Sequence, residues 1–411
     1  MKIAIIGGGI VGLALAIALR QRGLSPQVYE AAPEIKELGL GITLLPHAMR
    51  ELASLGLESE LRAGGIELCT SSFHNRFGQL LFQEPRGLAA GYPFPEISIP
   101  RGRLHGILHR KARELLGDEN ILTDHKLVSF DQDASGIELR FQCLSGRAAP
   151  APVRADIMIG CDGINSSVRK QLYPDDQVVF TGINTWRGVT WRKPILDGRT
   201  YLRVGSIRTG KIVIYPISNS PNGEGLQLVN WVAEIARPTS SMNDWNKNGK
   251  IDDILPIYKD WVFDWLDVPQ LIRDADCLLE YPMVDKDPLD RWTFGRVTLA
   301  GDAAHPMYPR GSNGSAQGLI DARVLAQLLA TTTDALSALV VYEAQRIGPT
   351  NEVVLTNRTS PPDIINIRVE ELTQDRPFDD LAKFISQDEL RQLSDKYKRI
   401  AGFAPDDVKH C

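Results

Sequence analysis

The first thirty residues alternate between apolar segments and short polar breaks. Residues 2–6 are an apolar, β-branched run typical of a buried strand, and the apolar segment over about residues 13–22 predicts a helix. Residues 25–29 predict a second strand, which ends at the acid Glu30. Glycines spaced G-x-G-x-x-G separate the first strand from the helix. Strand, glycines, helix, strand and acid in this order favour a nucleotide-binding unit over an ordinary tight turn.

The three glycines have separate uses in such a unit. Gly7 permits the sharp turn, Gly9 lets the backbone approach a pyrophosphate, and Gly12 lets the helix pack on the sheet. The helix N-terminus presents unpaired N–H groups and the positive end of its dipole to a phosphate. Glu30 follows at about the distance expected for a carboxylate that accepts hydrogen bonds from a ribose. We therefore expect a bound dinucleotide at this turn.

The pattern continues with predicted helices at residues 46–55 and 101–116, and with predicted strands in between over 60–100. Arg101 begins the second helix. An arginine at a helix start is usually solvated, but one that faces a dinucleotide would donate to phosphate or ribityl oxygens. Sequence alone leaves both interpretations open.

Three further strands are predicted at residues 120–129, 136–143 and 153–159, separated by turn-rich segments. The last of them runs into Gly-Cys-Asp-Gly and a helix start, so Asp162 stands at a second strand end. A helix cap would be a sufficient role for this aspartate.

The pattern over residues 180–236 differs from that of the preceding segments. It predicts alternating, aromatic-rich strands separated by Gly and Asn turns. This pattern predicts a mostly antiparallel sheet, inserted as a second domain, with one face available to cover a ligand. Residues 252–267 and 269–274 have amphipathic spacing and predict helices.

A buried-strand run returns at residues 296–300 and ends in Gly-Asp, which places the Asp302 carboxylate at the carboxyl edge of the sheet. A glycine-rich start opens a helix that is expected to reach about residue 330, and another helix is expected over 335–356. His305 invites a catalytic role, but no partner arrangement is apparent, so we interpret it as structural. The charged tail from about residue 361 predicts helical segments packed on the outside.

Composition narrows the classes of protein. The 411 residues are too many for one typical core and favour two interleaved lobes. Hydrophobic residues are 43%, charged residues 24% and the net charge is −5, which argues against partners such as nucleic acid or an anionic membrane. Five scattered cysteines without C-x-x-C favour neither disulfides, nor zinc, nor a dithiol centre. With no visible targeting signal, we expect a cytoplasmic protein.

Three motifs stand together in the chain: GGGIVG, GCDGINSSVR and GDAAHPMYPRGSNG. In this order and spacing they resemble the FAD-dependent aromatic-ring monooxygenases, the single-component flavoprotein hydroxylases. The resemblance extends to about residue 358. The stretches WRGVT, YPIS, LVNWV and YPMVDKDPL look like the branch that hydroxylates phenazine carboxylates and similar heteroaromatic acids.

The resemblance implies an α/β fold: a Rossmann-like FAD-binding domain with an inserted, mostly antiparallel β-sheet substrate domain and C-terminal helices. The expected ranges are residues 1–175 and 286–358 for the FAD-binding domain, 176–285 for the insert and 359–411 for the tail. A monomer or a homodimer would satisfy the resemblance equally.

The same resemblance implies roles for residues along the FAD. The glycines would hold the pyrophosphate and Glu30 the adenosine ribose, Arg101 would reach FAD, and Leu127 would meet the adenine through its backbone. Asp162 would serve FAD and the pyridine nucleotide, and Asp302 the ribityl chain. The segment 309–315 would lie beside the isoalloxazine ring, with cofactor contacts at Gly311, Asn313, Gly314 and Ser315. The family usually carries Gly-x-Gly here, whereas this chain has Gly-Ser-Asn-Gly, a difference that could reshape the substrate side.

The implied reaction is hydroxylation of an aromatic or heteroaromatic small molecule, with NADH or NADPH and O2 as cosubstrates and a flavin C4a-hydroperoxide as the oxygen donor. No catalytic side chain is expected, because the flavin carries the chemistry. We expect the pocket to include Pro309, Tyr215 and Trp186, with Arg203 or Arg187 as possible anchors for a carboxylate. The alternatives are an NAD-dependent dehydrogenase and a flavin-binding scaffold without turnover.

Overall fold

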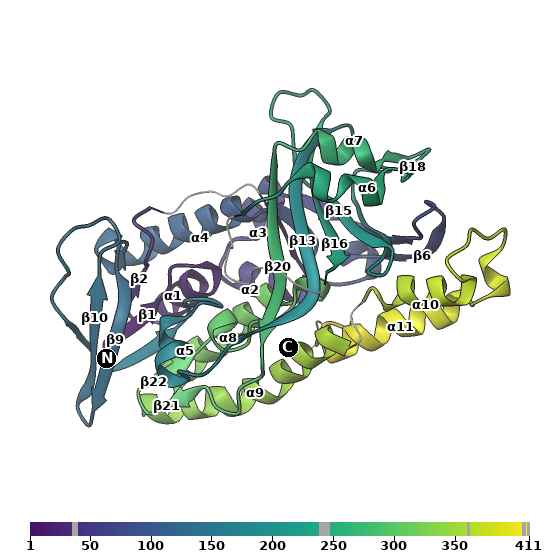
Figure 1. Ribbon diagram of the computed structural model, residues 1–411. Helices are drawn as coiled ribbons and strands as arrows, with labels where there is room; N and C mark the ends of the chain where they lie inside the picture. Colours follow the sequence, from purple (N-terminus) through teal and green to yellow (C-terminus); the bar gives the residue numbers. More distant parts are fainter. Residues whose placement is uncertain (35–39, 238–246, 360–361, 405–407, 409–411) are drawn as a thin grey trace.

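The structure is a computed structural model that describes residues 1–34, 40–237, 247–359, 362–404 and 408 (Figure 1). Its first layer is a six-stranded sheet in the order β21-β22-β12-β1-β2-β8. Five of these strands are parallel, and only β21 runs antiparallel to its neighbour. The strands are β1 (Ile3–Ile6), β2 (Pro26–Tyr29), β8 (Ile121–Leu122), β12 (Ile157–Gly160), β21 (Thr293–Phe294) and β22 (Val297–Leu299). The predicted Rossmann-like core is confirmed.

Helix α1 (Ile10–Gln21) is the centre of this layer. It packs between α4 (Arg101–Leu116) and α8 (Gly314–Thr331), and its residues from Gly12 to Leu19 are all buried. A helix covered on all sides needs no polar face, which explains its almost unbroken apolar sequence. Each buried Leu or Ile there contributes about 1.5–3 kcal/mol relative to an exposed side chain. Helix α9 (Ala335–Thr359) packs on the outside of α8.

The second layer is an eight-stranded sheet in the order β17-β20-β13-β16-β15-β14-β5-β6. All its pairs are antiparallel except β14 with β5. Its strands are β5 (Thr70–His74), β6 (Leu80–Pro85), β13 (Val178–Arg192), β14 (Thr200–Ser206), β15 (Gly210–Asn219), β16 (Gln227–Ala236), β17 (Lys247–Asn248) and β20 (Cys277–Lys286). The predicted antiparallel insert is present. It also takes β5 and β6 from the expected range 1–175, because they cover the edge that β14 would otherwise expose.

Smaller elements join the two layers. A three-stranded sheet, β3-β7-β4, lies beside β15, and another, β11-β10-β9, lies beside the first layer. The strands are β3 (Gly41–Leu44), β4 (Ile66–Leu68), β7 (Glu96–Pro100), β9 (Lys126–Asp133), β10 (Gly136–Gln142) and β11 (Val153–Ala155). The short helices are α2 (Pro46–Ser54), α3 (Glu58–Gly64) and α5 (Ser167–Leu172).

The outer face of the second sheet carries α6 (Leu255–Tyr258), α7 (Val268–Arg273) and a hairpin of β18 (Val262–Phe263) and β19 (Leu266–Asp267). The predicted helix over residues 252–267 is therefore wrong for most of its length. Tyr258, Trp261 and Leu266 point into one cluster with the strands beneath them. Burial of these aromatic side chains outweighs the weak helical periodicity.

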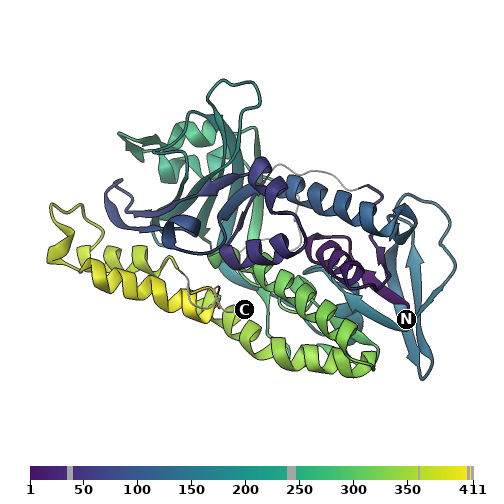
Figure 2. The ribbon, with the colours of Figure 1, turned by 180° about the vertical axis from the view of Figure 1, so that it is seen from behind.

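The C-terminal tail forms α10 (Ile364–Thr373) and α11 (Gln387–Ile400), which lie side by side below the second sheet (Figures 1 and 2). The helices are as predicted, but their place is not wholly external. Leu390 of α11 packs with Phe73 and Phe82 of β5 and β6, and Tyr397 is buried. None of the helices in the described part of the chain is long and apolar enough to cross a bilayer.

Candidate active site

The glycine turn after β1 meets the turn after β12. Gly7 has a φ of 103°, and a Cβ at this position would lie 2.5 Å from the carbonyl oxygen of Cys161. A Cβ on Gly12 would lie 2.0 Å from the carbonyl oxygen of Gly7, so α1 can follow the strand only with glycine there. A Cβ on Gly9 would meet nothing within 4 Å. The turn therefore has open space in front of Gly9, where a pyrophosphate is expected.

The third motif, GDAAHPMYPRGSNG, lies at the carboxyl edge of the first sheet, as the glycine turn does. It is brought there by close contact between helices α1 and α8. Gly301 and Gly318 both pack on Val11, and a Cβ on them would lie 2.9 and 2.5 Å from its Cγ2 atom. Helix α8 can thus approach α1 closely. Gly314 is its first residue and lies next to the Asp302 carboxylate, which would be 3.8 Å from a Cβ on that glycine.

Asp302 and Arg101 both lie at this edge. Both side chains are exposed, and Asp302 follows β22 while Arg101 begins α4. The protein around Asp302 removes enough water to raise the pKa of its carboxyl, and electrostatic interactions with His305 and Arg101 oppose that rise. An accessible carboxylate and an accessible guanidinium offer an acceptor and donors to one extended polar ligand.

The Glu30 side chain is held in place beside the glycine turn that follows β1. Its carboxylate accepts hydrogen bonds from the backbone N–H of Gly8 at 2.7 Å and of Ala32 at 2.8 Å. Two backbone donors hold the carboxylate in place in front of the turn. Leu127, in β9, has its side chain buried, so only its backbone is available to an adenine ring.

Asp162 is occupied as a helix cap in this structure. Its carboxylate accepts hydrogen bonds from the hydroxyl of Ser166 at 2.5 Å and from the backbone N–H of Ser167 at 2.7 Å, at the start of α5. The pKa of Asp162 is raised by burial, and these bonds oppose the shift. The cap is the role that the structure shows for this carboxylate.

Arg169, in the same motif, was not singled out from the sequence. Its guanidinium is fully buried, forms an ion pair with Asp176 at 2.8 Å and donates to the carbonyl oxygen of Ala304 at 2.9 Å. It thereby ties the second motif to the third. The signal was its place at the end of GCDGINSSVR, three residues after Ser166, the N-cap of α5.

His305 has a partner that the sequence did not reveal. Its Nε2 lies 2.6 Å from Asp321 of α8, and the same carboxylate pairs with Arg346 at 2.8 Å and accepts from the backbone N–H of Gly301 at 3.0 Å. The cluster is buried below the edge. It fixes the turn that carries Asp302, which favours the structural interpretation of His305.

The segment 309–315 is held from behind by the C-terminal tail. The Asn313 side chain is buried, with its amide oxygen 3.0 Å from Nε2 of His47 and its amide nitrogen 3.1 Å from the Tyr397 hydroxyl. A Cβ on Gly311 would lie 1.5 Å from that hydroxyl. Asn313 can therefore offer a cofactor only its backbone, whereas Pro309 is exposed and Ser315 half-buried.

His47 makes the free energy of unfolding depend on pH. Burial lowers its pKa to about 3, so the imidazole stays neutral while the unfolded chain binds a proton below about pH 6.5. The free energy of unfolding is therefore expected to fall as the pH decreases from about 6.5 towards 3. In His47→Gln this contribution is absent, and urea titrations should show a smaller loss between pH 7 and pH 5. An unchanged loss would contradict this role, and His125→Gln, at a half-buried site, serves as the control.

The inner face of the second sheet looks toward this edge. Arg187, Val232, Val213 and Arg203 form one cross-strand row on it. Tyr215 lies in the next row, stacked on Tyr201 with centroids 5.0 Å apart. Tyr215 therefore lies on the same face as Arg187 and Arg203, and its role in a pocket stays a prediction.

Trp186 requires a correction. It is fully buried in the cluster on the outer face of the sheet, and it stacks under the guanidinium of Arg237. Because successive strand residues point to opposite faces, its neighbour Arg187 is the one on the inner face. Trp186 cannot line a pocket there.

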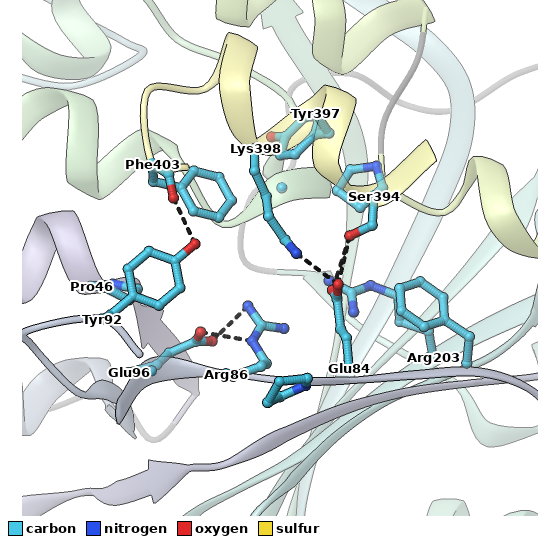
Figure 3. Close-up of a pocket in the computed structure, with 15 residues that line it drawn as sticks. Pro46, Glu84, Arg86, Tyr92, Glu96, Arg203, Ser394, Tyr397, Lys398 and Phe403 are labelled. Carbon is cyan, nitrogen blue, oxygen red and sulfur yellow. Dashed lines mark hydrogen bonds and ion pairs between the residues drawn. The ribbon is translucent and has the colours of Figure 1, made fainter. Parts of the chain in front are cut away.

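A cavity lies at the junction of the inner face, the segment 309–315 and the tail (Figure 3). Arg203 and Phe73 contribute from the sheet, Gly311 from the segment, and Tyr397 and Phe403 from the tail. Sequence alone does not predict this cavity, because the tail reaches it only through the fold.

These residues fit a flavin dinucleotide. One edge of the first sheet carries the open space at Gly9, the fixed Glu30 carboxylate and the accessible side chains of Arg101 and Asp302. Helix α8 begins beside this edge. The fold and this site define a dinucleotide-binding oxidoreductase with a separate sheet to cover its substrate.

Comparison with known proteins gives the family. The FAD binding domain family model matches residues 1–240 and 283–354. The chain is 40% identical to phenazine 1,6-dicarboxylic acid hydroxylase of Lysobacter antibioticus, over 87% of this chain and 89% of that protein. It is 29% identical to 3-hydroxybenzoate 6-hydroxylase of Polaromonas naphthalenivorans, over 87% and 86% of the two chains. The chain belongs to the FAD-dependent aromatic monooxygenases and is an enzyme of this kind.

A solved structure agrees. The chain superposes on Klebsiella pneumoniae HpxO, in its complex with FAD and uric acid, with a TM-score of 0.77. The two are 25% identical, and the match covers 100% of this chain and 97% of that one. FAD is thus the cofactor, with NAD(P)H as the reductant typical of these hydroxylases.

Proposed function

We propose that this enzyme hydroxylates a flat, carboxylated aromatic or heteroaromatic ring. The observation that carries the proposal is the meeting of three motif segments at one sheet edge, directly below the inner face of a second sheet. The names of the relatives support the substrate class, since both the phenazine and the benzoate hydroxylase act on ring acids. The 40% identity favours a substrate of several fused rings.

FAD would lie along the edge, and it supplies the activation of oxygen that no side chain can provide. The glycine turn would hold the pyrophosphate, Glu30 the ribose, and Asp302 with Arg101 the ribityl chain and phosphates. The N-terminal dipole of α8, which begins at Gly314, would stabilise negative charge on the ring system beside it. Gly311 and Asn313 would contribute through their backbone.

The inner face of the second sheet would hold the substrate ring against this edge. The stacked pair Tyr201 and Tyr215 is a flat apolar surface of the right kind, and Pro309 of the segment 309–315 is exposed. A site closed in this way keeps water from the reacting atoms and orients the ring. Asp162 remains a candidate for contact with the pyridine nucleotide only if its cap at α5 opens.

We further propose that the ranges 1–175 with 286–358, 176–285 and 359–411 act as cofactor, substrate and tail units, with β5 and β6 added to the second. A cytoplasmic place suits the supply of NAD(P)H, and either a monomer or a homodimer is compatible with the proposed site.

The test is NAD(P)H oxidation by the purified, FAD-loaded protein with a panel of phenazine, pyridine and benzoate-type acids, together with assay of hydrogen peroxide. At least one ring acid is expected to accelerate oxidation with little peroxide. Stimulation by none, in a protein that holds FAD, would contradict the proposal and favour a flavin-binding scaffold instead.

A further inference from the structure

Two side chains hold the glycine turn after β1, one at each polar group of Gly8. The Glu30 carboxylate accepts a hydrogen bond from the Gly8 N–H at 2.7 Å, and Nε2 of His105 lies 2.6 Å from the Gly8 carbonyl oxygen. Because a carbonyl oxygen can only accept a hydrogen bond, the imidazole must carry a proton on Nε2 and donate it. The backbone of Gly8 is therefore fixed by two elements outside the turn.

His105 reaches the turn from helix α4, which packs beside α1 (Figure 1). It follows Arg101 by four residues, so the two side chains lie on one face of the helix and are about one turn apart. Arg101 is exposed at the sheet edge, whereas His105 is half-buried against the turn. One helix face thus carries an accessible guanidinium and an imidazole that is bound to the backbone of the turn.

The hydrogen bond from His105 also sets the direction of the Gly9 N–H. None of the peptide bonds in the described part of the chain is cis, and the C=O and N–H of a trans peptide point in opposite directions. Since the Gly8 carbonyl points to α4, the Gly9 N–H points away from α4. This N–H donates to none of the described residues, and a Cβ on Gly9 would meet nothing within 4 Å.

The peptide between Gly8 and Gly9 needs such a support, because glycine has the widest choice of backbone conformations. Gly9 is the N-cap of α1 and has no side chain with which to cap the first turn, so the N–H groups there lack a partner. A pyrophosphate in front of the turn would accept hydrogen bonds from these groups. A donor that is already oriented before the ligand arrives lowers the entropic cost of binding.

We propose that His105 is a positioning residue for FAD, which holds the Gly8 carbonyl and so directs the Gly9 N–H to the pyrophosphate. The inference rests on the proposed placement of FAD along this edge. It concerns affinity for the cofactor and is independent of the ring compound that is hydroxylated.

The experiment titrates the FAD-free protein with FAD, followed by the change in flavin absorbance, and uses ADP and adenosine as competitors. Both competitors contain the ribose proposed to bind Glu30, but only ADP carries two phosphates. In His105→Leu, the Kd values of FAD and ADP are expected to rise about 3- to 10-fold, the range for one lost hydrogen bond, while that of adenosine stays unchanged. His105→Asn, whose amide is too short to reach Gly8, should show the same loss and replaces the leucine variant if that one does not fold.

His105→Gln is the conservative variant. Its longer amide can reach the carbonyl and donate without any positive charge, so it is expected to keep most of the wild-type affinity for FAD and ADP. His109→Leu is the matched control, because His109 lies one turn further along α4 and is also half-buried. It should bind all three ligands like wild type. Thermal unfolding of each FAD-free protein checks that the variants are folded.

Each contrary result has a distinct meaning. A folded His105→Leu that binds FAD and ADP like wild type overturns the role of His105, and so does equal weakening of ADP and adenosine. A glutamine variant no better than the leucine variant shows that hydrogen-bond donation is not what matters and also overturns it. If ADP does not compete with FAD in wild type, the pyrophosphate does not lie at this turn and the inference fails. The hydroxylase function stands in all these cases, because NAD(P)H oxidation with ring acids tests it separately.

Discussion

Asp302→Ala is expected to lose most of its bound FAD. The carboxylate is the accessible acceptor at the end of β22, beside the first residue of α8, and among the described residues no other acid takes that place in the third motif. Its removal would take away the acceptor that we propose for the ribityl hydroxyls, and it would leave the charge of Arg101 unopposed. The FAD-to-protein ratio, read from the visible and ultraviolet absorbance of the purified variant, measures the effect.

The control for that experiment is Asp388→Ala, which removes an exposed carboxylate from the first turn of α11, far from the edge. It should purify with full FAD. Because a bound ligand stabilises the folded state, Asp302→Ala should also unfold at a lower temperature, and added FAD should restore part of the difference. An Asp302→Ala protein that purifies yellow, with one FAD per chain, would contradict the FAD-binding role of this carboxylate.

Asp321→Asn is expected to cost about 3–5 kcal/mol of unfolding free energy, the largest effect on stability among the changes considered. The substitution keeps the shape of the side chain but leaves the buried guanidinium of Arg346 without its counterion, and it weakens the hydrogen bond to His305. It also weakens the acceptor for the Gly301 N–H, so the turn that carries Asp302 loses its support. Urea unfolding of the FAD-free protein measures the loss.

Asp287→Asn provides the comparison. Its side chain is 73% exposed and pairs with Arg358, so its neutralisation is expected to cost less than about 1 kcal/mol. If Asp321→Asn were as stable as Asp287→Asn, the buried cluster would not be what holds the third motif in place. Reduced FAD affinity in Asp321→Asn, with Asp302 still present, would show that the cluster acts through the turn.

The cofactor half of the molecule could be predicted from sequence because its signals are local. Each motif is a strand end followed by a helix start, and Gly7 and Gly12 fit their turn only as glycine. Parallel strands bring their carboxyl ends to one edge, so the motifs had to meet. The same reasoning could not find Asp321, because a partner one helix further along leaves no pattern near His305.

The substrate half was harder to predict because its geometry is set by distant segments. In TWRGVTW, polar and aromatic residues occupy both phases of the strand, so alternation alone could not place Trp186 and Arg187 on their correct faces. The Asn313 side chain turns inward because of Tyr397, which follows it by 84 residues along the chain. Contacts of that range are fixed by packing and not by local preference.

The cavity of Figure 3 has a consequence for synthesis on the ribosome. Strands β5 and β6 are made early, their parallel neighbour β14 much later, and Tyr397 and Phe403 close to the end. The nucleotide edge is complete once α8 has been made, whereas the cavity beside Gly311 still lacks its tail residues at that stage. A product that stops before α11 would keep the glycine turn but leave the cavity without Tyr397 and Phe403. The cavity is thus completed only when the last helix has been made.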